Sequence, residues 1–104
     1  MQEITVKDLK QKFDNKEYFQ LIDVRETFEY EMSNIGGENI PLAGILIEID
    51  RISKDKPVIV HCRSGKRSAI AIMQLERLGY TNLYNLKGGI LAWAAEIDST
   101  MQVY

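Results

Sequence analysis

The alternation of short apolar runs with helix-forming stretches is the feature that most constrains the fold of this chain. The run Val58-Ile59-Val60 is uninterrupted and β-branched, which is typical of a central strand buried on both faces of a parallel sheet. From Lys66 to Leu78 the apolar residues take a helical spacing, and Gly79 is well placed to end that helix. Strands and helices in alternation predict an α/β domain with a mainly parallel sheet.

The same pattern continues along the rest of the chain. We expect strands at 3–6, 20–24, 39–41, 58–60 and 83–86, and helical segments at 7–15, 26–31, 46–52 and 66–78. A final helix is expected to begin at Gly88-Gly89, with Ile90, Leu91 and Trp93 among its core contacts. We find no repeat, linker or low-complexity tract, so residues 1–104 are interpreted as one domain.

Composition narrows the function classes. The 104 residues are 45% hydrophobic and 27% charged, which is enough apolar material for a core. Thirteen basic and 15 acidic residues give a formal net charge of −2, which argues against a nucleic-acid-binding protein. We see no apolar run of membrane-spanning length and no signal-peptide pattern at the N-terminus, so we expect a cytoplasmic protein without a membrane partner.

Cysteine usage constrains the chemistry further. Cys62 is the single cysteine, so no internal disulfide forms and a reducing compartment is expected. No second cysteine can resolve an intermediate on Cys62, so any sulfur chemistry requires an external acceptor. One histidine and one cysteine cannot make a structural zinc site by themselves, and we expect neither a metal nor a cofactor.

The segment after the apolar run 58–60 is the strongest candidate for a functional site. A strand ending at His61 leads through a six-residue loop, Cys62 to Arg67, into a helix, and ligands of open α/β sheets bind beyond the carboxyl ends of strands. Gly65 allows the loop to curl so that its N–H groups point inward, where the helix dipole also favours an anion. We therefore expect a reactive Cys62 with a pKa below the ordinary value of about 8.5. The predicted substrate-binding residues are Arg63, Ser64, Gly65, Lys66 and Arg67.

Cys62 and its polar neighbours also have possible structural roles. A lone cysteine after an apolar strand is often an inert core residue, but the polar, basic and small residues after Cys62 favour reactivity. His61 is interpreted as a packed histidine rather than a general base, because neighbouring residues of a strand point to opposite faces. Asp23 and Arg25 are expected to form a structural ion pair at a strand end.

Four segments together resemble the rhodanese homology domain over nearly the whole chain. They are LIDVRE at 21–26 with Glu29-Tyr30, IGGENIPL at 35–42, VHCRSGKRS at 60–68 and LKGGILAW at 86–93. The resemblance implies a five-stranded parallel sheet flanked by helices. It also implies transfer of sulfane sulfur from thiosulfate, polysulfide or a protein persulfide to cyanide or a thiol. Cys62 would be the nucleophile that carries the persulfide, the following loop would be the cradle, and Lys66 and Arg67 would supply charge for the substrate.

Two positions depart from the pattern, and three alternatives remain. Asn34 and Gly37 stand where many members have His and Ala. Cysteine phosphatases and arsenate reductases place five residues between Cys and Arg, whereas four separate Cys62 from Arg67, and no general-acid Asp is evident. A non-catalytic binding or regulatory module would be marked by loss of the cysteine or of Gly65, and both are present. A sulfur carrier that accepts persulfide from a partner protein is not separated from an enzyme by the sequence.

Overall fold

The computed structural model describes residues 1–103, which form a five-stranded sheet in which every pairing is parallel. In spatial order the strands are β1 (Glu3–Ile4), β5 (Leu83–Leu86), β4 (Val58–His61), β2 (Gln20–Asp23) and β3 (Glu38–Asn39). The β-branched run therefore lies in the central strand, as its composition predicts, and the predicted fold class is confirmed.

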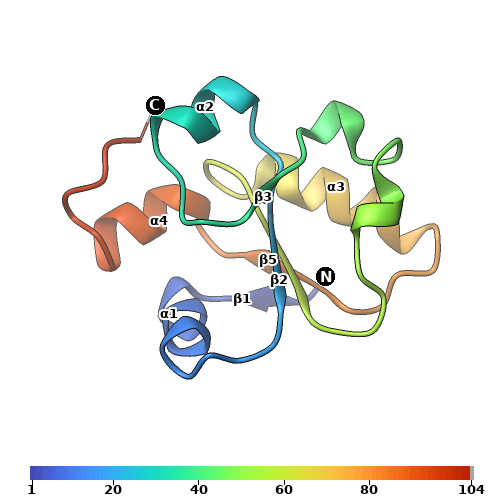
Figure 1. Ribbon diagram of the computed structural model, residues 1–104, viewed down its shortest axis with the longest axis horizontal. Coiled ribbons are helices and arrows are strands. Elements are labelled where there is room, and N and C mark those ends of the chain that lie inside the picture. The colour runs from blue at the N-terminus through green and yellow to red at the C-terminus, as the bar shows by residue number, and fades with distance from the viewer. Residues whose placement is uncertain (104) are drawn as a thin grey trace.

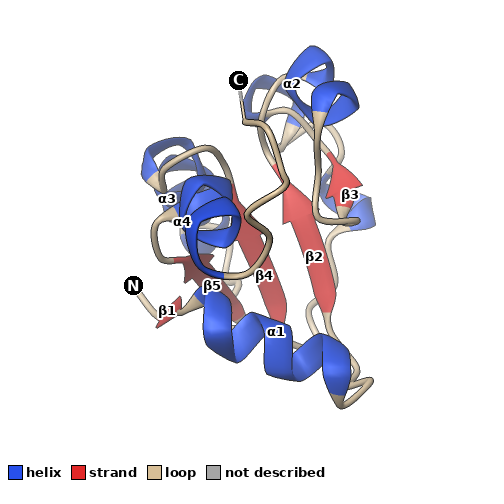
Figure 2. Cartoon of the chain, turned by 90° about the vertical axis from the view of Figure 1, so that its left-hand side faces the viewer, coloured by secondary structure: helices blue, strands red, loops and turns tan. Residues whose placement is uncertain are grey.

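Helices cover both faces of the sheet (Figures 1 and 2). Helices α1 (Val6–Asp14) and α4 (Gly89–Glu96) pack on one face, and α3 (Lys66–Glu76) packs on the other. Helix α2 (Thr27–Met32) lies beyond the carboxyl end of β2. The carboxyl end of the sheet therefore lies between α2 and the start of α3, which is where the candidate loop emerges.

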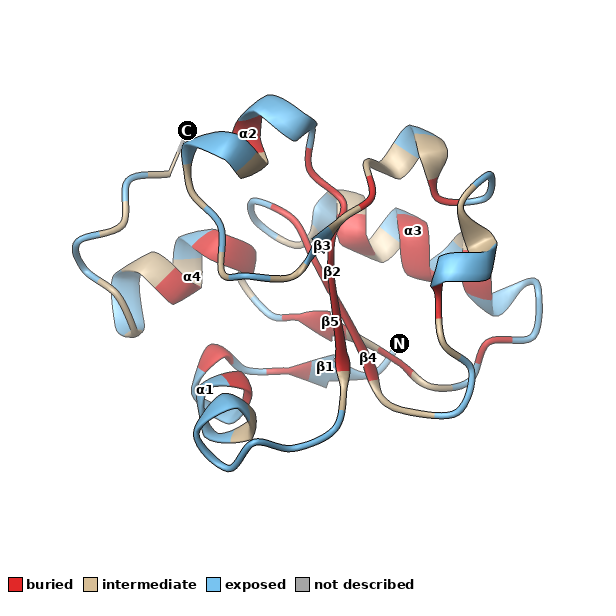
Figure 3. Ribbon diagram, viewed as in Figure 1, coloured by how far each residue is buried: buried red, intermediate tan, exposed pale blue. Residues whose placement is uncertain are grey.

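The register of the neighbouring strands β2 and β4 divides the core into two clusters. Leu21 pairs with Ile59 and both face α1 and α4, whereas Ile22 pairs with Val60 and both face α3. All four residues of β4 are buried, and Figure 3 shows the central strands almost wholly in the buried colour. This alternation places His61 and Val60 on opposite faces of the sheet.

Strand β1 is shorter than predicted because the helix after it begins early. The Thr5 hydroxyl accepts a hydrogen bond from the backbone N–H of Asp8 at 3.1 Å, so Thr5 is the N-cap of α1. Val6, which we expected at the end of the strand, instead starts the helix and is 2% exposed. The prediction of a strand over 3–6 was wrong for its last two residues.

The predicted helix over 46–52 was also wrong for most of its length, because only 49–51 are helical, as one 3₁₀ turn. The structure has two short 3₁₀ helices here, η1 (Leu42–Gly44) and η2 (Ile49–Arg51), joined by a turn. The side chain of Gln20 donates to the Arg51 carbonyl at 2.7 Å and accepts from the Ser53 N–H at 2.9 Å. These bonds satisfy the Arg51 carbonyl and the Ser53 N–H, and they anchor this segment to the start of β2.

In α4 the predicted core contacts are only partly confirmed. Ile90 and Trp93 are buried, but Leu91 is 36% exposed. Its backbone N–H, rather than its side chain, makes a contact with another segment, the loop after β4. Among residues 1–103, no helix is long and apolar enough to cross a membrane.

Candidate active site

The candidate loop folds back over its own cysteine. Gly65 takes a left-handed conformation with φ +113° as the N-cap of α3, and its N–H donates to the Cys62 sulfur at 3.1 Å. Cys62 is 1% exposed. The cysteine therefore lies buried beneath the loop.

Ser68 and Asn85 form the wall beside that sulfur. The hydroxyl oxygen of Ser68 lies 3.4 Å from the Cys62 sulfur and donates to the Asn85 side-chain oxygen at 2.6 Å. The Asn85 amide donates in turn to the Gly65 carbonyl at 3.1 Å. These bonds tie α3, β5 and the loop together. Sequence reasoning did not single out either residue, although a polar Asn within an otherwise apolar strand was a usable signal.

Hydrogen bonds to the Cys62 sulfur affect the pKa of its thiol more than burial does. Burial raises the pKa of the Cys62 thiol, but the hydroxyl of Ser68 and the backbone N–H groups of Ser68, Gly65 and Ser64 bring it below its ordinary value. The direction agrees with the expectation from the sequence. The groups chiefly responsible are N–H and O–H donors directed at the sulfur.

The start of α4 holds the outer side of the loop. The N–H groups of Ile90 and Leu91 donate to the carbonyls of Cys62 and Arg63 at 3.0 and 3.1 Å. Gly89 has φ +58°, and a Cβ added there would lie 2.5 Å from both of those carbonyl oxygens. Glycine at this position therefore lets the start of α4 approach the two carbonyls closely enough to bind them.

The three basic residues of the loop have different surroundings. The side chains of Arg63 and Lys66 are exposed, whereas Arg67 is only partly exposed. The Arg67 guanidinium makes two bonds to the Glu29 carboxylate, at 2.7 and 3.0 Å. Glu29 belongs to α2 and is 5% exposed. The predicted contact of Arg67 with substrate remains a prediction, and its charge is already paired in this structure.

Below the loop lies a buried ionic cluster. Asp23, Arg25 and His61 are all fully buried, and Arg25 donates through Nε and Nη2 to the Asp23 carboxylate. A further bond from Arg25 reaches the Ser33 carbonyl at 2.7 Å. The structural ion pair expected from the sequence is confirmed. Burial lowers the pKa of His61 below its ordinary value, which keeps the imidazole neutral and fits a packed role.

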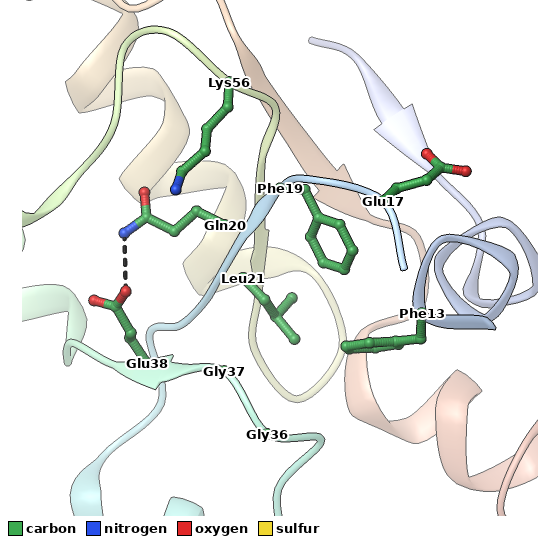
Figure 4. Close-up of a pocket in the computed structure, with 9 residues that line it drawn as sticks. All are labelled: Phe13, Glu17, Phe19, Gln20, Leu21, Gly36, Gly37, Glu38 and Lys56. Carbon is green, nitrogen blue, oxygen red and sulfur yellow. Dashed lines mark hydrogen bonds between the residues drawn. The ribbon is translucent and has the colours of Figure 1, made fainter. Parts of the chain in front are cut away.

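A cavity of about 420 Å³ lies elsewhere, between α1 and the amino end of β2 (Figure 4). It includes Gln20 at the start of β2, whereas Cys62 follows the opposite end of the sheet. Its acidic groups already have partners, since Glu17 binds Lys12 and Glu38 accepts from Gln20. The cavity therefore offers no support to the chemistry of the loop.

Comparison with known proteins gives concordant matches. A family model described as Rhodanese-like domain matches residues 5–96. The uncharacterized protein YqhL of Bacillus subtilis is 44% identical over 81 residues, which cover 77% of this chain and 64% of that protein. A protein of Allochromatium vinosum named Sulfurtransferase is 38% identical over 93 residues, which cover 88% of this chain and 87% of that protein. In another curated relative the matching region is 26% of a longer protein.

A solved structure agrees with these matches. The rhodanese-related protein of Thermoplasma volcanium superimposes with a TM-score of 0.81 at 32% identity. The superposition covers 93% of this chain and 94% of that chain.

Proposed function

Because this chain belongs to the rhodanese-like domain family, we propose that it is a sulfurtransferase that carries sulfane sulfur as a persulfide on Cys62. One observation carries the proposal: the Cys62 sulfur is ringed by donors, with the Gly65 N–H at 3.1 Å and the Ser68 oxygen at 3.4 Å. Such donors stabilise a thiolate, and they would equally stabilise the anionic outer sulfur of a persulfide. The relative named Sulfurtransferase supports the same reaction class.

The reaction proceeds in two displacements at sulfur. The Cys62 thiolate attacks the outer sulfur of the donor, a new S–S bond forms and the S–S bond of the donor breaks. The donor leaves as sulfite from thiosulfate, as a polysulfide shorter by one sulfur from a polysulfide, or as a thiol from a protein persulfide. An external thiolate or cyanide then attacks the terminal sulfur and releases the Cys62 thiolate. Each step exchanges one S–S bond or passes its sulfur to the acceptor, so no outside oxidant or reductant is needed.

The loop supplies the binding groups for this reaction. Backbone N–H groups of Ser64 and Gly65 are directed at the sulfur, and the exposed cations Arg63 and Lys66 would attract anionic donors. A free, single cysteine supports a reducing compartment such as the cytoplasm, with an external thiol as the acceptor.

Phosphatase chemistry fits this geometry poorly. A phosphoenzyme intermediate requires a tetrahedral group bonded to the sulfur and enclosed by the loop. Here the Gly65 N–H already approaches the sulfur to 3.1 Å, which leaves a narrow ring around it. The short spacing from Cys62 to Arg67 points in the same direction.

Intact-mass spectrometry tests the proposal. We expect the protein to gain one sulfur after incubation with a sulfane donor, to lose it to a thiol reductant, and to show no hydrolysis of an aryl phosphate. Cys62→Ser should abolish both loading and turnover. Absence of loading from thiosulfate, polysulfide and persulfide alike would overturn the proposal. Repeated turnover with a small thiol distinguishes an enzyme from a carrier that is loaded once by its partner.

A further inference from the structure

We propose that Glu29 determines donor specificity at this site, because its bonds to Arg67 neutralise the least exposed cation of the loop and thereby favour monoanionic persulfide donors over dianionic thiosulfate. This inference rests on the sulfurtransferase function proposed above. It assigns a role to a residue of α2, outside the loop, and narrows the class of donor.

The position of Glu29 is held from two sides. Both of its carboxylate oxygens accept from the Arg67 guanidinium, at 2.7 and 3.0 Å. One of them also accepts the backbone N–H of Glu26 at 3.0 Å, at the start of α2. Since Glu29 is 5% exposed, water has little access to its carboxylate, which favours the bidentate contact with Arg67.

Both members of the pair are charged at neutral pH. The hydrogen bonds from Arg67 lower the pKa of Glu29, against the opposing effect of burial. The hydrogen bonds to Glu29 raise the pKa of Arg67, and the negative charge of Cys62 adds to that rise. Arg67 therefore lies within electrostatic range of the reacting sulfur, where it acts as half of a neutral pair rather than as a bare cation.

With Arg67 paired, the preference between donors depends on the charge that each donor carries. Thiosulfate brings two negative charges to the Cys62 thiolate: Cys–S⁻ and S₂O₃²⁻ give Cys–S–S⁻ and SO₃²⁻. A persulfide brings one: Cys–S⁻, R–S–S⁻ and H⁺ give Cys–S–S⁻ and R–SH. The exposed side chain of Lys66 acts through water and salt, which screen it, whereas the Arg67–Glu29 pair is partly buried and screened less.

Glu29→Gln removes the charge and keeps the size of the side chain. Its oxygen can still accept from Arg67 and from the Glu26 N–H, whereas the second bond from Arg67 is lost because an amide nitrogen does not accept. In this variant we expect kcat/KM for thiosulfate to rise about tenfold, mainly through KM, because Arg67 then carries an uncompensated charge. For 2-hydroxyethyl persulfide, whose only charge is that of the persulfide, the change should stay below about threefold, and added salt should shrink the thiosulfate gain.

Two matched variants control the experiment. Asp14→Asn removes one negative charge from the exposed Lys10–Asp14 pair of α1 and should leave both donors unaffected. Glu29→Asp keeps the charge and should retain the wild-type preference. Should Glu29→Gln fail to fold, the wild type alone still tests the inference, because its kcat/KM should favour 2-hydroxyethyl persulfide over thiosulfate by at least about tenfold.

The outcomes separate the two proposals. Equal use of both donors by the wild type, or an equal effect of Glu29→Gln on both, would overturn the role of Glu29 and leave sulfur transfer intact. Failure of the wild type to load sulfur from either donor would instead overturn the proposed function itself.

Discussion

Replacing Ser68 with Ala should raise the pKa of Cys62 by about one unit. The Ser68 hydroxyl is the largest contributor among the groups that lower this pKa, and it is fully buried 3.4 Å from the sulfur. A hydrogen bond to a charged group contributes about 1.5–3 kcal/mol, and one pKa unit corresponds to about 1.4 kcal/mol. The long contact places the effect at the lower end of that range.

The Cys62 sulfur and the Asn85 oxygen compete for the hydroxyl proton of Ser68, which also limits the change in pKa. Ser68 donates to the Asn85 oxygen at 2.6 Å, and a hydroxyl has a single proton to donate. When Cys62 ionises, the proton can turn towards the sulfur only by leaving Asn85. Part of the gain at the thiolate is therefore offset, which again favours a shift of about one unit over two.

The rate of alkylation by iodoacetamide as a function of pH measures this shift. Ser64→Ala is the matched control: Ser64 acts through its backbone N–H, so loss of its exposed hydroxyl should leave the midpoint unchanged. The buried Asn85 oxygen loses its donor in Ser68→Ala, which should cost about 1–3 kcal/mol of stability, so urea unfolding is recorded alongside. A midpoint in Ser68→Ala at or below that of the wild type would refute the reasoning.

Two further predictions concern stability. Gly89→Ala should lower the free energy of unfolding by about 2 kcal/mol or more in urea titrations and raise the Cys62 pKa, because the new Cβ would lie 2.5 Å from the Cys62 and Arg63 carbonyl oxygens and φ is +58°; an unchanged unfolding midpoint would contradict the described packing of α4. The lowered pKa of Glu29 means that its ion pair stabilises the fold fully above the unfolded-state pKa of about 4.3 and loses that contribution as pH falls through the lower folded value. The stability difference between wild type and Glu29→Gln, followed by thermal unfolding, should therefore be greatest near neutral pH and shrink in acid, and a difference independent of pH would contradict an ionised Glu29.

The features that could be predicted from the sequence are local ones. The β-branched run 58–60 identifies the central strand because burial on both faces demands it. A cysteine followed by a curled, glycine-containing loop and a helix already implies an anion cradle, since the backbone N–H groups there have no helical partners. The exposed side of α4 was harder to predict. Leu91 has an apolar side chain that points outward, while its N–H binds the loop.

The parts that could not be predicted depend on contacts between distant residues. Glu29 and Arg67 are 38 positions apart, and nothing local to either one shows that they meet. The bond from Ser68 to Asn85 likewise joins a helix to a strand that follows it. In the segment 46–52, helical spacing was misleading, since the Arg51 and Ile52 N–H groups bond three residues back. The side chain of Gln20 then holds the Arg51 carbonyl and the Ser53 N–H at the end of the segment. Tertiary hydrogen bonds of this kind override local propensity.

The tether between α4 and the loop has a consequence for how the protein is made. The carbonyls of Cys62 and Arg63 are held by the N–H groups of Ile90 and Leu91, which leave the ribosome well after the cysteine does. Until that last helix docks, the nascent chain carries an ordinary thiol in an unformed loop. The loop that holds the proposed nucleophile is thus completed late in synthesis. A chain that stops before the final helix would contain Cys62 but would lack the backbone bonds that hold its loop.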